Sequence, residues 1–185
     1  MTLKRTSNWD DYFLRIAKVV SENSKCHSRK IGAVLVKDKA IISTGYNGPP
    51  RGMTECGVLN EYGDIWRPAC PRKEQGFASG EGLHLCPAAH AERNALIQAA
   101  RTGVSTKGST LYCYCEQVCK DCASEIVNAG VERLVYLDGG IPYDDLAGKI
   151  LKECDIKVDV VPGHSHLPKR PKRESLLKEG KGGPT

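Results

Sequence analysis

The sequence predicts an α/β fold of three layers, with a five-stranded mixed sheet between two layers of helices. Two observations indicate this fold: segments of helical and strand periodicity alternate along the chain, and two strand-like runs near its start are joined by a short turn. Of the 185 residues, 40% are hydrophobic and 26% are charged, which is typical of a globular domain with a buried core. This composition excludes a fibrous or wholly disordered chain.

The first elements are a helix and a hairpin. Apolar side chains recur at helical spacing over residues 8–22, so we expect an amphipathic helix there with Asn8 as its cap. Residues 31–36 and 40–46 are short apolar or β-branched runs separated by Lys-Asp-Lys. This pattern predicts a β-hairpin.

A long segment without periodicity follows. Residues 51–85 are rich in Gly, Pro and charge, and they contain Cys56, Cys70 and His84. A loop of this length is uncommon in a small domain unless something pins it. We therefore expect a link between this segment and the domain.

The remaining chain alternates between helix and strand. The predicted elements are helices over residues 87–101, 119–128 and 144–154, and strands over residues 110–115, 134–137 and 158–161. Gly103 and Gly130 follow the first two of these helices, as expected of helix ends. The alternation implies that helices cover both faces of the sheet.

Charge separates a domain from a tail. Residues 162–185 hold six Lys or Arg and two Glu, a net charge of +4 out of +5 for the whole chain, so residues 1–161 are nearly neutral. We expect residues 1–161 to form the domain and the basic tail to be solvated and disordered. Nucleic acid is therefore an unlikely partner of the domain, although a basic tail can also contact RNA, DNA or a protein.

Cysteine content and hydropathy indicate a cytoplasmic metal protein. No stretch approaches the roughly 20 apolar residues that a membrane span needs, and no apolar run follows the first residues. We therefore expect no membrane contact. Nine cysteines, an odd number, cannot all pair with one another, and in an intracellular chain such cysteines more often bind metal.

Two short motifs carry the chemistry. His90-Ala91-Glu92 and Cys119-x-x-Cys122 each open a predicted helix, whose positive end stabilises thiolates. Three ligands of His and Cys type leave the fourth position of a tetrahedral zinc open, as in catalytic sites. Each motif alone has an ordinary alternative: the histidine can be a cap or a surface residue, and Cys-x-x-Cys can be a redox pair or half of a structural site.

Glu92 is the candidate for moving protons at this site. A zinc ion makes water acidic enough to act near neutral pH, and a carboxylate beside it must take the proton. Residues two apart in a regular helix face different ways, so His90 and Glu92 can share a site only in the first turn. Pro87, just upstream, is consistent with that position.

These motifs resemble the deoxycytidylate deaminase branch of the zinc-dependent cytidine deaminase superfamily, whose signature is His-x-Glu followed by Pro-Cys-x-x-Cys. The matching segments are Ser-Lys-Cys at 24–26, Ile-Gly-Ala-Val at 31–34, Ser-Thr-Gly-Tyr-Asn-Gly at 43–48, His-Ala-Glu-Arg-Asn-Ala at 90–95, Ala-Ala-Arg at 99–101 and Asn-Ala-Gly at 128–130. The resemblance covers residues 9–161. It implies a cytidine deaminase-like fold.

The resemblance also implies a reaction, the hydrolytic deamination of dCMP to dUMP with release of ammonia. His90, Cys119 and Cys122 would bind zinc, Glu92 would carry protons to N3 of the ring and to the leaving amine, and Asn47 would hold the sugar. It further implies dCTP and TTP as effectors and a homo-oligomer.

One position departs from the family pattern. Val118 stands where relatives usually have Pro before the first motif cysteine, so we expect a looser loop over the metal and a less certain substrate preference. Cys113 and Cys115 precede it, and their simplest interpretation is buried small residues on a strand.

A second, structural zinc is suggested by four further cysteines, in part through the resemblance. These candidates are Cys26, Cys56, Cys70 and Cys86, which would clip the 51–85 segment onto the domain. Independent buried thiols are the alternative. Candidates for contact with phosphate are Arg29, Lys30, Arg51 and Arg101, each of which can instead be a surface charge.

Two other functions stay open at this point. The chain can be a deaminase of another substrate, such as adenosine in tRNA or a different cytosine nucleotide, with the tail binding phosphates. It can also be a metal-stabilised binding module without activity, in which case Glu92 is only a surface carboxylate.

Overall fold

The computed structural model describes residues 8–26, 28–53, 55–56, 70–78, 81–139 and 145–162. The predicted basic tail lies outside the described residues from position 163 onward, so its expected disorder stays a prediction. No helix in the described ranges is both long and apolar enough to cross a lipid bilayer.

The centre of the fold is a mixed sheet of five strands, as predicted. The strands are β1 (Gly32–Lys37), β2 (Ala40–Tyr46), β3 (Thr110–Tyr114), β4 (Arg133–Leu137) and β5 (Lys157–Val161). They lie in the order β2-β1-β3-β4-β5. Strand β1 is antiparallel to both of its neighbours, whereas β3, β4 and β5 run parallel. Parallel neighbours need a crossover, and helices supply it here.

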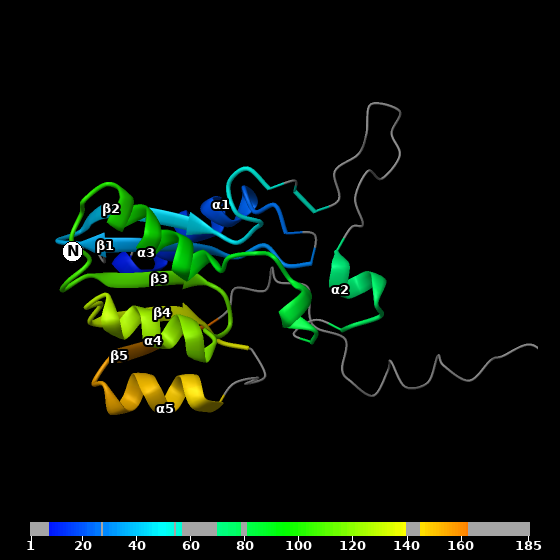
Figure 1. Ribbon diagram of the computed structural model, residues 1–185. Coiled ribbons are helices and arrows are strands. Elements are labelled where there is room, and N and C mark those ends of the chain that lie inside the picture. The colour runs from blue at the N-terminus through cyan, green and yellow to red at the C-terminus, as the bar shows by residue number, and fades with distance from the viewer. Residues whose placement is uncertain are drawn as a thin grey trace, which may run out of the picture.

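Helices cover both faces of the sheet, which confirms the three layers (Figure 1). These helices are α1 (Trp9–Glu22), α3 (Ala91–Arg101), α4 (Lys120–Asn128) and α5 (Asp145–Glu153). Alternate residues of β1 point to opposite sides: Val34 and Val36 pack with α1, whereas Ala33 and Leu35 pack with α3 and α4. The sheet is therefore buried on both faces over β1 and β3.

The first helix and the hairpin form as their sequence predicts. Asn8 caps α1, since its side-chain oxygen accepts a hydrogen bond from the Asp10 backbone N–H at 3.2 Å. In the hairpin, Asp38 and Lys39 form a two-residue turn with φ of 51° and 62°. Positive φ at both positions matches the right-handed twist of the flanking strands.

Helix α3 begins four residues later than the predicted start at 87. Residues before Ala91 are extended, and Ala89 pairs with Gly48 through two backbone hydrogen bonds of 2.9 and 3.1 Å. The alanine-rich composition favours a helix there, but this pairing holds the backbone beside the end of β2. The 51–85 segment also contains two elements that its sequence did not indicate, the short helix α2 (Pro71–Glu74) and a 3₁₀ turn (Leu83–Leu85).

A charged network ties α1 to strands β4 and β5. The guanidinium of Arg133 on β4 donates two hydrogen bonds of 2.8 Å to the carboxylate of Asp10, and a third of 2.6 Å to Asp159 on β5. The Tyr112 hydroxyl also donates to Asp10 at 2.9 Å. Because both guanidinium edges are occupied, Arg133 links α1, β4 and β5.

Candidate active site

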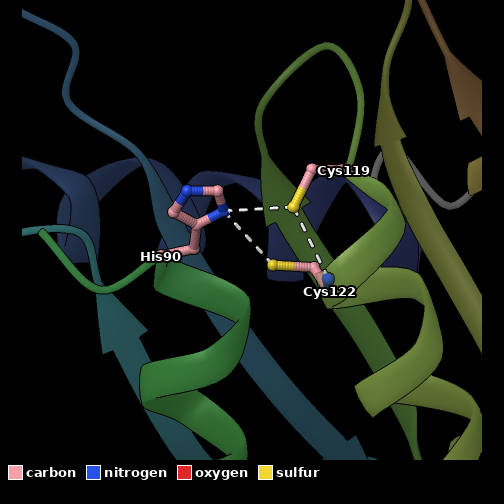
Figure 2. A group of neighbouring side chains, drawn as sticks. All are labelled: His90, Cys119 and Cys122. Carbon is pink, nitrogen blue, oxygen red and sulfur yellow. Dashed lines mark hydrogen bonds between the residues drawn. The ribbon is translucent and has the colours of Figure 1, made fainter. Parts of the chain in front are cut away.

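The site forms where α3 and α4 begin. His90 is the N-cap of α3 and Cys119 is the N-cap of α4, and both have extended backbone dihedral angles. Cys122 lies in the first turn of α4. Figure 2 shows the three side chains converging from the two helix starts. The structure thus brings together the three side chains that the sequence places at the starts of two helices.

The spacing of the three donor atoms fits a tetrahedral zinc. Nδ1 of His90 lies 3.4 Å from Sγ of Cys119 and 3.3 Å from Sγ of Cys122 (Figure 2). Zinc bonds of ordinary length at tetrahedral angles would place a nitrogen and a sulfur about 3.6 Å apart. The trio therefore fits zinc and leaves one position of a tetrahedron open.

Electrostatics at the trio favour a thiolate at Cys119. The Cys122 thiol donates to the Cys119 sulfur, and with help from His90 and the Cys122 backbone N–H this lowers the pKa of Cys119 to about 4. The hydrogen bond between His90 and Cys119 in turn raises the pKa of His90. Cys119 is also the N-cap of α4, where the positive end of the helix dipole stabilises a thiolate. A preformed thiolate is the form of cysteine that binds metal.

Glu92 is buried beside the trio, in the first turn of α3. Its side chain is 3% exposed, and burial raises the pKa of its carboxyl above the ordinary value, with His90 acting in the opposite direction. Within the described part of the chain, Oε2 of Glu92 has no hydrogen-bond partner. Buried carboxylate oxygens usually have one, so this oxygen is available for a ligand or water.

The first turn of α3 is fixed by contacts with β2. A Cβ on Gly45 would lie 2.3 Å from the backbone oxygen of Ala91, so the two backbones touch. The Asn94 side chain donates to the Tyr46 carbonyl at 2.7 Å. These contacts set the position of His90 and Glu92 relative to the sheet.

With this geometry in place, comparison with known proteins is decisive. The family model of the cytidine and deoxycytidylate deaminase zinc-binding region matches residues 7–138. The chain belongs to this deaminase family. The match includes the metal trio and Glu92, and it confirms the resemblance inferred from the motifs.

Two relatives with more than a third of their residues identical are deoxycytidylate deaminases. The enzyme of Saccharomyces cerevisiae is 36% identical over 152 residues, which cover 82% of this chain and 44% of the relative. The enzyme of Mycobacterium phage D29 is 39% identical over 134 residues, which cover 70% of this chain and 94% of the relative. The chain thus spans less than half the length of the yeast relative and most of the phage one.

A solved member of the family supports the fold. The dCMP deaminase of cyanophage S-TIM5, crystallised in complex with dCMP and dUMP, aligns with a TM-score of 0.58 and 28% identity. The alignment covers 82% of this chain and 95% of that chain. The cytidine deaminase-like fold expected from the sequence is therefore confirmed.

Asn47, predicted to hold the sugar of a deaminase substrate, is engaged within the protein. Its Oδ1 accepts hydrogen bonds from the Ile31 N–H at 2.8 Å and the Ser24 hydroxyl at 2.6 Å, and its Nδ2 donates to the Arg29 carbonyl at 2.8 Å. The side chain therefore holds the segment between α1 and β1. One N–H of Nδ2 is left for a ligand, so the sugar contact stays a prediction.

The candidates for a phosphate contact lie in different places. Arg29 forms an ion pair of 3.4 Å with Glu116, in the loop that leads to Cys119. Arg51 and Arg101 instead bond to Gln98 at 3.3 and 3.5 Å, near the end of α3. Gln98 is eight residues beyond His90, about 12 Å along the helix. The partner of Arg29 is thus three residues before Cys119, whereas the partner of Arg51 and Arg101 lies toward the far end of α3 from His90.

The segment before the motif cysteines is anchored in the core. Val118, which replaces the usual Pro, is 1% exposed and packs in the cluster between the sheet and α4. Cys113 and Cys115 are buried, as expected. Their position beside Glu92 was missed by sequence reasoning, and the only signal for it is their alternation with Tyr112 and Tyr114 along a strand.

The four cysteines predicted to hold a second zinc do not form a group with one another within the described residues. Among the described residues, which include all four, groups of three or more metal-type donors do not contain Cys26, Cys56, Cys70 or Cys86. A second structural zinc stays a prediction.

Proposed function

We propose that the protein catalyses the hydrolytic deamination of dCMP to dUMP with release of ammonia. The observation that carries this proposal is the unpartnered, buried carboxylate oxygen of Glu92 beside His90, Cys119 and Cys122. Support comes from the cyanophage relative, whose crystals contain dCMP and dUMP. The high coverage of the phage D29 enzyme supports the same activity.

His90, Cys119 and Cys122 are the residues that would hold the zinc ion. When bound, zinc acts as a Lewis acid and makes water a nucleophile near neutral pH. The cap positions of His90 and Cys119 fix the direction of two ligands before any metal arrives. This preorganisation reduces the cost of assembling the site.

Glu92 moves the protons. Its carboxylate accepts a proton from the attacking water and delivers it to N3 of the cytosine ring, while oxygen forms a bond to C4. A second proton, from the hydroxyl that the water leaves on C4, then passes through Glu92 to the amine, which leaves as ammonia when the C4–N4 bond breaks. A raised pKa suits this role, because the carboxyl must accept a proton and later return it.

Binding of the nucleotide involves the segment between α1 and β1. Asn47 holds this segment through its bonds to Ser24, Ile31 and Arg29, and its remaining N–H would donate to the sugar. Arg29 would contact the phosphate, with its guanidinium released from the half-buried pair with Glu116. These roles follow from position and chemistry.

A pair of variants tests the catalytic role of Glu92. Glu92→Gln keeps the shape of the side chain but cannot accept a proton, so ammonia release from dCMP should fall by at least about a hundredfold. Zinc content, measured by atomic absorption, should stay unchanged. The matched control is Glu153→Gln at the exposed end of α5, which should retain full activity. Full activity in Glu92→Gln with normal zinc content would overturn the catalytic role of Glu92. Absence of ammonia release from the unaltered, zinc-loaded protein would support a binding module instead.

A substrate panel tests the choice of dCMP. Rates should be compared for dCMP, CMP, dCTP, deoxycytidine and a tRNA anticodon stem-loop. We expect dCMP to be turned over with the highest kcat/KM. Turnover of the RNA alone would overturn the proposal in favour of a tRNA adenosine deaminase.

Effectors, assembly and metal number belong to the same proposal. We expect dCTP and TTP to change the rate with dCMP, and the protein to form a homo-oligomer, as the family resemblance implies. Metal analysis of the purified protein tests the second zinc, since Cys26→Ser should lower the zinc-to-chain ratio if that site exists. A ratio of one in both proteins would exclude it.

A further inference from the structure

A second group of metal-type donors lies beneath the candidate active site. The carboxylate of Glu92 and the thiols of Cys113 and Cys115 have donor atoms within 4.8 Å of one another. Their exposed fractions are 3%, 0% and 2%. The deamination proposed above uses the carboxylate but neither thiol.

Strand geometry explains why these groups converge. Cys113 pairs with Ala33 of β1, and the Cys115 carbonyl accepts a hydrogen bond of 2.9 Å from the Leu137 N–H, so both backbones are held at the sheet. Residues two apart on an extended chain point to the same face. That face packs against α3, whose first turn carries Glu92.

The chemistry of this group is that of a metal site. Two thiols and one carboxylate suit a borderline or soft divalent ion such as Zn²⁺ or Cd²⁺. Oε2 of Glu92 has no partner among the described residues, although the group is almost fully buried. A core built only for packing would place apolar atoms there, because a buried carboxylate oxygen without a partner is costly.

We propose that Glu92, Cys113 and Cys115 form a second, inhibitory site for a divalent d¹⁰ metal ion. Binding releases the two thiol protons to solvent and places the metal on the carboxylate that the reaction needs. The ion thereby withdraws Glu92 from proton transfer without displacing the zinc held by His90, Cys119 and Cys122. Only the inhibition rests on the proposed function, because metal binding at this group does not depend on deaminase activity.

Cadmium is the probe for this site. Crystals of the zinc-loaded protein soaked in Cd²⁺ should show an anomalous peak between Glu92, Cys113 and Cys115. In solution, Cd²⁺ should add cadmium–thiolate charge-transfer absorption and should suppress dCMP turnover, and a mild chelator should reverse both. The zinc content should stay constant throughout.

Variants assign the effect to these thiols. Cys113→Ala and Cys115→Ser should each retain basal turnover and raise the inhibitory Cd²⁺ concentration by at least about tenfold, since even outer partners of a metal site change affinity by that factor. The matched control is Cys154→Ser, because Cys154 is exposed on the outer end of the fold, and this variant should respond like the parent.

The outcomes separate this proposal from the proposed function. An anomalous peak at the three residues in a protein without deaminase activity supports the site and overturns the function. Equal inhibition of the parent, Cys113→Ala and Cys115→Ser overturns the site. Absence of the cadmium peak in soaked crystals of the parent protein also overturns the proposed site. This test does not depend on whether the variants fold.

Discussion

Gly45 and Ala91 touch backbone to backbone, because a Cβ on Gly45 would lie 2.3 Å from the Ala91 carbonyl oxygen. The same Cβ would lie 2.3 Å from the backbone nitrogen of Ala95. Strand β2 and helix α3 therefore approach as closely as two backbones can. His90 and Glu92 flank Ala91, so this contact fixes how close both side chains lie to the sheet.

Gly45→Ala should damage both stability and activity. The added methyl group must push α3 away from β2, which should lower the free energy of unfolding by about 3 kcal/mol. Deamination should also fall, since His90 and Glu92 move with the helix. Urea unfolding and kcat/KM for dCMP measure the two effects. The control is Gly148→Ala within α5, where nothing lies within 4 Å of the new methyl, and it should raise stability by up to about 1 kcal/mol. Equal stability of the two variants would contradict the contact.

Asn47→Asp should separate the structural role of this side chain from a role in binding. A carboxylate still accepts from the Ile31 N–H and the Ser24 hydroxyl, but it faces the Arg29 carbonyl without a donor. The free energy of unfolding should fall by about 2 kcal/mol. Ser24→Ala removes one of these bonds and should cost about 1 kcal/mol. Thermal unfolding checks both, and a raised KM with unchanged stability would show that Asn47 serves only the ligand.

Asp10 should make stability depend on acid pH. Hydrogen bonds from Arg133 hold the pKa of the Asp10 carboxyl below its ordinary value of 3.8. A carboxyl with a depressed pKa contributes stability above its unfolded-state pKa and loses it as pH falls through the folded-state value. Asp10→Asn should therefore cost about 2 kcal/mol at pH 7 and progressively less below pH 3.8. Urea midpoints from pH 7 to pH 2.5 test this, and a constant difference between the two proteins would refute it.

Removal of zinc should destabilise the domain, because the trio joins the starts of α3 and α4. A ligand present at about 1,000 times its Kd stabilises by about 4 kcal/mol, so a strong chelator should lower the melting temperature. Cys122→Ala should melt lower from the outset and respond much less to the chelator. Cys154→Ser should behave like the parent protein. An identical chelator response in Cys122→Ala would place the metal elsewhere.

The grouping of His90, Cys119 and Cys122 could be predicted from the sequence because these residues mark the starts of two helices. Such starts are visible locally, from His90 and from the spacing of Cys119 and Cys122. The sheet was also predictable, since each strand shows its own period. The start of α3 could not be predicted, because it is set by the pairing of Ala89 with Gly48, which lie 41 residues apart. This pairing prevails over the local composition, which favours a helix.

Contacts across the fold were hidden for the same reason. No local pattern shows that Cys113 and Cys115 lie against Glu92, because they meet only after α3 packs on β3. The internal bonds of Asn47 likewise depend on how the segment between α1 and β1 closes. The spacing of residue types along the sequence indicates where helices start and which strand residues share a face. The partners of buried polar groups depend instead on tertiary packing.

The link between Asp10 and Arg133 also has a consequence for how the chain folds. Its two residues are 123 positions apart, so this link cannot form until β4 has been synthesised, well after α1. Until β4 pairs with β3, the apolar face of α1 with Phe13 and Leu14 has only part of its partner surface. Contacts at such sequence separation slow folding and prolong the exposure of apolar surface. During synthesis, part of the apolar face of α1 therefore stays uncovered until β4 has been made and paired.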